Sequence, residues 1–67
     1  MRFKIELELE ADGRWIAEIP EISGVMAYGG TRDEALQRAQ ALALRVIADR
    51  LEHKETDPLL DVSFHAA

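Results

Sequence analysis

The sequence predicts a two-layer α+β domain, in which an antiparallel β-β-β meander is followed by one long helix and a final short strand. Three observations predict this class. Polar and apolar residues alternate strictly near the N-terminus, apolar residues recur every three or four positions in mid-chain, and glycine and proline separate the two patterns. With 67 residues and no cysteine, the chain is expected to form one domain, residues 1–67, without disulfides. The helix is expected to cover one face of the sheet.

The first two strands are expected at about residues 2–10 and 14–20. One face of the first strand is apolar and carries Phe3, Ile5, Leu7 and Leu9, whereas the other carries Lys4, Glu6, Glu8 and Glu10. Asp12-Gly13 is typical of a type I′ hairpin turn, whose two central positions need positive φ. Pro20 has no amide hydrogen to donate and is expected to end the second strand.

The third strand is expected at about residues 25–28, after a bend that Gly24 permits. Gly29-Gly30 then leads into a helix over about residues 32–53. Its start is marked by Thr31 and Glu34, a capping box in which each side chain accepts the other's backbone N–H. Asp57-Pro58 stops the helical path. Alternating apolar residues then predict a last strand over about residues 59–65.

The apolar arc of the helix is wider than one sheet in a small domain needs. The residues expected on the sheet-facing side are Ala35, Leu36, Ala39, Leu42, Ala43, Val46, Ile47 and Leu51. Leu44 falls at the edge of this arc, and Ala41 and Ala48 fall on the outer face. Since so small a core is marginal by itself, we expect a homo-oligomer, a dimer or a tetramer, with Ala41, Leu44 and Ala48 at its interface.

The acidic charge argues against nucleic acid as a direct ligand. The chain carries eight Lys and Arg residues against thirteen Asp and Glu, a net charge of −5. Its expected polar sheet face gathers Glu6, Glu8, Glu10 and Glu18. This face is either a solvated surface that discourages further strand pairing or an electronegative docking surface for a basic protein.

No feature of the sequence favours catalysis or a bound cofactor. Carboxylates spaced along one strand are a poor metal site, because magnesium and calcium sites usually draw oxygens from several segments. Gly29-Gly30 before a helix could cradle an anion, but the lysine of a P-loop is missing and a structural turn is preferred. His53 stands at the end of the helix, where a histidine usually compensates the dipole, His65 lies near the C-terminus, and Ser23 and Ser63 are typical of turn or strand-surface residues. Without a long apolar run or a signal peptide, a cytoplasmic protein is expected, neither an enzyme nor a membrane protein.

A series of spaced residues carries a family resemblance that covers about residues 3–51. The series comprises Gly13, Pro20, Gly24, Gly29, Thr31, Glu34 and Ala35. In this spacing the chain resembles the N-terminal domain of HicB-like antitoxins, which restrain HicA-type RNA-cleaving toxins. The resemblance implies a trimmed RNase H-like fold without catalytic carboxylates, which covers the active site of a small basic toxin. Gly30 departs from the family, which often has an acidic residue there.

A second departure limits what the resemblance implies. Nine residues follow Pro58, too few for the DNA-binding motif that full antitoxins carry, so operator binding is not expected. Two functional hypotheses remain. The chain is either a stand-alone antitoxin that binds a HicA-like toxin, or a solo homo-oligomeric domain with a scaffold or small-ligand role and no toxin.

Overall fold

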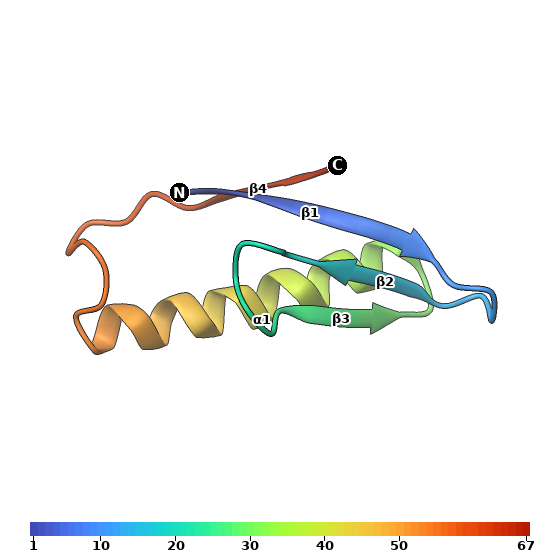
Figure 1. Cartoon of the computed structure of the whole chain (residues 1–67), viewed down its shortest axis with the longest axis horizontal. Helices are drawn as coiled ribbons and strands as arrows, with labels where there is room; N and C mark the ends of the chain where they lie inside the picture. The colour runs from blue at the N-terminus through green and yellow to red at the C-terminus, as the bar shows by residue number, and fades with distance from the viewer.

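The computed structural model describes all 67 residues and has one helix packed against a four-stranded sheet (Figure 1). The elements in chain order are β1 (Arg2–Leu9), β2 (Trp15–Glu18), β3 (Met26–Gly29), α1 (Arg32–Glu52) and β4 (Ser63–Ala66). The predicted α+β class and the β-β-β-α-β order are confirmed.

The strand order in the sheet is β3-β2-β1-β4. β1, β2 and β3 form the expected antiparallel meander, whereas β4 pairs in parallel with β1 and forms an edge of the sheet. The sequence predicts that the last strand begins at about residue 59, but in the structure it begins at Ser63. The reason is the register: Arg2 is the first paired residue of β1 and lies opposite Ser63, so residues 59–62 lie beyond the paired part of β1.

The hairpin between β1 and β2 has a longer loop than predicted. Glu10 N–H donates to the Arg14 carbonyl, and Gly13 N–H donates to the Glu10 carbonyl. Of the two central residues of the expected type I′ turn, Gly13 has positive φ (89°) and Asp12 does not. The type I′ prediction is therefore wrong, because a three-residue loop with a glycine bulge needs positive φ only at its last position.

The connection between β2 and β3 is a compact loop that contributes to the core. Ile19, Ile22 and Val25 are all buried, and Ile19 N–H closes the loop by donating to the Val25 carbonyl at 3.1 Å. Gly24 takes a φ of 83°, which supplies the expected bend. Pro20 lies just after β2, where its missing N–H costs no strand pairing.

The start of α1 is pressed onto the end of β3. A Cβ on Gly29 would lie 2.5 Å from the backbone nitrogen of Ala35, so this position has no room for a side chain. Thr31 Oγ1 accepts the Glu34 N–H at 3.1 Å, as a capping box requires. The reciprocal bond differs from the prediction: Glu34 Oε1 accepts the N–H of Gly30, at 2.9 Å, instead of that of Thr31. The cap thus ties the helix to the linker that leaves β3.

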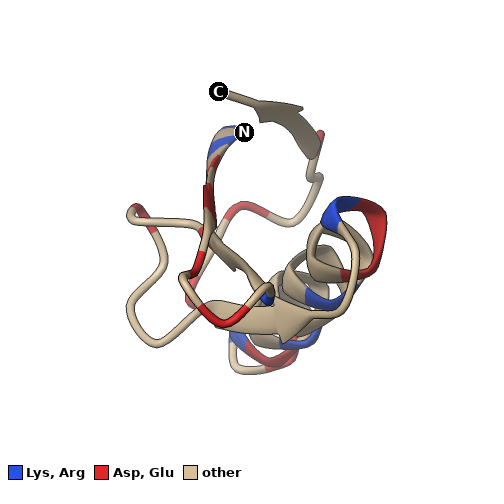
Figure 2. Ribbon diagram, turned by 90° about the vertical axis from the view of Figure 1, so that its right-hand side faces the viewer, with Lys and Arg blue, Asp and Glu red and all other residues tan.

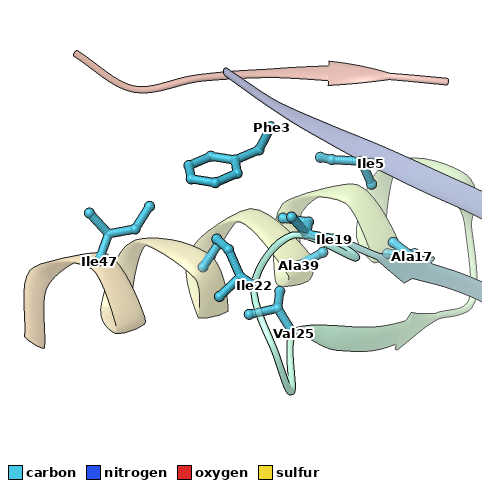
Figure 3. Packing of buried hydrophobic residues seen from close by; sticks show 10 residues of the cluster. Phe3, Ile5, Ala17, Ile19, Ile22, Val25, Ala39 and Ile47 are labelled. Atoms are coloured by element: carbon cyan, nitrogen blue, oxygen red, sulfur yellow. The ribbon is translucent and has the colours of Figure 1, made fainter. Parts of the chain in front are cut away.

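The core lies between the sheet and the alanine-rich side of α1. The buried helix residues are Ala35, Ala39, Ala43 and Ile47. The small alanines allow close approach to β2 and β3, and farther along the helix Ile47 and the Phe3 ring of β1 point into the same space (Figure 3). Leu51, expected on this side, is 41% exposed. The last turns of α1 extend past β2 and β3, which explains that exposure (Figure 1).

The C-terminal end of α1 is closed by backbone hydrogen bonds. Lys54 adopts a left-handed conformation with φ of 59°, and Glu55 N–H donates to the Arg50 carbonyl at 2.8 Å. This is the Schellman arrangement, in which glycine is the usual residue at the left-handed position. The helix therefore ends at Glu52, and the left-handed Lys54 turns the chain away before the expected stop at Asp57-Pro58.

Candidate functional site

The strongest candidate for a functional surface is the face of the sheet that α1 leaves uncovered. Because side chains alternate along a strand, the residues that oppose the core-facing ones all point to this side. The register places Glu6 of β1 opposite Glu18 of β2, and Glu8 opposite Ile16. On the next strand, Tyr28 lies opposite Ile16, and Met26 lies opposite Glu18. We call these six residues the outer face.

The outer face combines a concentrated negative charge with exposed apolar groups. Glu6 and Glu18 are directly opposed like charges, an arrangement that destabilises a sheet unless something compensates it. Glu6, Glu8, Ile16 and Glu18 line a shallow hollow between β1 and β2. Met26 and Tyr28 lie beside this hollow and are 48% and 40% exposed. In Figure 2, acidic residues recur along β1, whose first residues are basic.

A second hollow adjoins the outer face at the β2–β3 loop. It is lined by Glu18 and Met26 together with the loop that runs from Ile19 to Val25. Glu18 is therefore shared by both hollows, with backbone and apolar side chains around it. A long cationic side chain of a partner could bind in these hollows, because its stem can contact the apolar wall while its charge meets the Glu18 carboxylate.

One end of the outer face is held by Arg14. Its guanidinium stacks on the ring of Tyr28, 4.6 Å from the ring centroid, and its Nε donates to the carboxylate of Asp12 at 2.8 Å. Asp12 also accepts the backbone N–H of Arg14. That backbone hydrogen bond is the main reason that the pKa of Asp12 lies below its ordinary value, and the Arg14 side chain lowers it further. Tyr28 is thus oriented by a charged neighbour.

The structure brings three of the four predicted surface carboxylates together. Glu6, Glu8 and Glu18 share the outer face, whereas Glu10 lies beyond the end of β1 in the hairpin. Sequence reasoning missed Met26 and Tyr28, which are two of the three apolar side chains of this face. Their alternation with Ala27 was a usable signal, but it needed the pairing of β3 with β2 to give it a direction.

The predicted oligomer residues lie on a different surface. Ala41, Leu44 and Ala48 are all exposed on α1, with Leu44 at 49%, and Leu51 continues the same row. They are spaced along the side of the helix that faces away from the sheet. Nothing in the chain covers them, so their role at an interface stays a prediction.

The remaining titratable residues are scattered. His53 Nδ1 lies 3.3 Å from the Asp49 carboxylate one helical turn earlier. His65 lies on β4 opposite Lys4, and its Nδ1 is buried without a hydrogen-bond partner. The chain has no group of three or more His, Cys, Asp and Glu side chains arranged to hold a metal ion. α1 does not combine the length and apolar character that a membrane-spanning helix needs.

No protein-family model, curated protein or solved structure matches the chain.

Proposed function

We propose that the chain is a non-catalytic protein-binding module that docks a small basic protein on its outer face. In keeping with the resemblance of residues 3–51, the partner that we propose is a HicA-type RNA-cleaving toxin, which a HicB-like antitoxin masks in the cytoplasm. The observation that carries the proposal is the opposition of Glu6 and Glu18 next to half-buried Ile16 and exposed Tyr28 and Met26.

The charge pattern supports a basic partner over a purely solvated face. A solvated face needs neither two carboxylates directly opposite each other nor apolar side chains beside them, and both features cost free energy in the isolated domain. A basic partner would relieve the repulsion between Glu6 and Glu18, and it would bury Met26 and Tyr28. Such complementary charges also speed association and make it sensitive to salt.

A matched pair of charge reversals tests the proposal. The double variant E6K/E18K changes the outer face, whereas E52K/E55K makes the same change in net charge at the far end of α1, where both side chains are exposed. The partner to be tested is any small basic protein encoded in a reading frame adjacent to that of this chain. The assay measures toxin cleavage of RNA as the chain is titrated in, together with the dissociation constant at low and moderate salt.

We expect the natural chain and E52K/E55K to protect the RNA, and E6K/E18K to bind at least tenfold more weakly. Binding should also weaken as salt rises. Equal protection by both variants would exclude the outer face as the docking surface. If the adjacent frames encode no small basic protein, the proposal fails, and the solo homo-oligomeric domain with a scaffold or small-ligand role replaces it.

A further inference from the structure

The two edge strands of the sheet, β3 and β4, differ in how their outward-facing backbone groups are protected from pairing with another strand. At the β3 edge, the Arg38 guanidinium donates to the Tyr28 carbonyl at 3.0 Å, which occupies a backbone group that would otherwise be free. β4 forms the other edge and has no such protection. It contains no charged residue, proline or glycine, although these are the usual means of blocking an edge strand. Figure 2 shows β4 without Lys, Arg, Asp or Glu along it.

The register of β4 identifies the backbone groups that are free. Ser63 N–H donates to the Met1 carbonyl and Ala67 N–H to the Ile5 carbonyl, so the odd-numbered residues of β4 face β1. The N–H and C=O groups of Phe64 and Ala66 therefore point away from the sheet. They form a short edge that is open to pairing.

Apolar side chains beneath this edge are only partly covered. Leu60, Val62 and Phe64 pack against the core without being buried in it, and so do Leu42 and Val46 of α1. The chain exposes 4654 Å², about 400 Å² more than the roughly 4,250 Å² expected for a compact monomer of 7.5 kDa. A further layer of protein on the β4 side would cover Leu60, Val62 and Phe64 and reduce the exposed area.

We infer that β4 pairs with β4 of a second copy of this chain, in an antiparallel arrangement about a two-fold axis at Phe64. A two-fold axis makes any strand its own antiparallel partner, so a second copy supplies both a matching edge and a matching apolar layer. Phe64 then lies opposite its equivalent and extends the stack that it makes with Phe3, whose ring centroid is 5.8 Å away. The two sheets join into one.

Charge also favours a second copy at this place. The carboxylates of the outer face lie on β1 and β2 toward the hairpin, whereas β4 pairs with the part of β1 that contains Arg2 and Lys4. Two chains of net charge −5 can therefore meet at β4 with the carboxylates of their outer faces apart.

Engineered cysteines test the register directly, because the chain has none of its own. In the inferred dimer, position 63 lies opposite position 65 of the second copy as a non-hydrogen-bonded pair, with Cα atoms about 4.5 Å apart, within disulfide range. We expect S63C/H65C to form a covalent dimer on mild oxidation. The single variants S63C and H65C, whose equivalent positions are farther apart, are the controls and should remain mostly unlinked.

Two proline variants test the edge by mass in solution. Ala66→Pro removes an N–H that points outward, whereas Ala67→Pro removes the N–H that donates to Ile5 within the sheet. At micromolar concentration we expect light scattering to give a dimer for the natural chain and for A67P, and a monomer for A66P. Circular dichroism checks that each variant is folded.

Dimerisation through the exposed row on α1, instead of through β4, would give a different result. If Leu44→Glu splits the dimer while A66P leaves it intact, the interface is the exposed row on α1 and the inference is wrong. The inference would also be overturned if the natural chain stayed monomeric at concentrations up to about 100 μM. The same holds if the S63C/H65C variant forms no more covalent dimer than the single variants do.

Discussion

The closeness of α1 to β3 makes a sharp prediction about two adjacent glycines. A Cβ added at Gly29 would meet backbone atoms of the helix, at 2.5 Å from Ala35 N and 2.9 Å from Glu34 C. At Gly30 the nearest atom is the Glu34 carboxylate oxygen, 4.0 Å away, and φ is not positive. We therefore expect Gly29→Ala to destabilise the domain and Gly30→Ala to be tolerated.

The size of the stability loss in Gly29→Ala depends on which atoms must move to make room for the added Cβ. Overpacking against rigid neighbours costs about 1–3 kcal/mol, and the neighbour of Gly29 is helix backbone that cannot rotate away, so about 2 kcal/mol is expected. For a domain of this size that lowers Tm by roughly 10 °C. Gly30→Ala should instead raise stability by about 0.4–1 kcal/mol, because alanine restricts the unfolded chain more than glycine does.

Thermal and urea unfolding followed by far-UV circular dichroism, at one protein concentration, measure both effects. The two variants should differ by about 3 kcal/mol in free energy of unfolding, in opposite directions from the natural chain. Equal Tm values for G29A and G30A would show that α1 is not pressed onto β3 as described, and the account of this corner would be wrong.

Two smaller effects follow from the backbone at the helix end and at the hairpin. Lys54→Gly should stabilise the domain by roughly 1 kcal/mol in urea unfolding, because Lys54 is left-handed and glycine is not penalised there, while Lys54→Ala should bring no such gain. Since the Arg14 backbone N–H lowers the pKa of Asp12, the stability that Asp12 contributes is present above the ordinary pKa of an aspartate and is lost as pH falls through its lowered value. NMR titration should find that pKa below the ordinary one, and Asp12→Asn should remove this part of the acid sensitivity.

The faces of the elements could be predicted from sequence because they depend on periodicity alone. The alternation from Phe3 to Leu9 assigned Glu6 and Glu8 to the solvent side, and the three-to-four spacing assigned Ala35 to the core. A period fixes which residues share a face before any partner is known. The existence of the outer face was predictable in this way.

Pairing and loop geometry could not be predicted, because they depend on where distant segments lie. The position of β4 beside β1 sets the start of the last strand at Ser63, and no local pattern encodes that register. Likewise Glu34 bonds to Gly30 because β3 delivers the linker to the helix start at close range. In both cases the local alternatives are nearly equal in free energy, and tertiary contacts decide which register or hydrogen-bond partner is adopted.

The two inferred surfaces are compatible, and together they predict a stoichiometry. Pairing at β4 leaves Glu6 and Glu18 free and places both outer faces on the same side of one continuous sheet. They are roughly 30 Å apart, because they are offset both across the strands and along them from the two-fold axis. A dimer would then bind two basic partners, so native mass spectrometry should find a 2:2 complex for the natural chain and a 1:1 complex for A66P. Each outer face lies within one chain, so A66P should keep the affinity of a single site. A loss of partner binding in a folded, monomeric A66P would mean that the partner contacts both chains, and that the outer face of one chain is not a complete site.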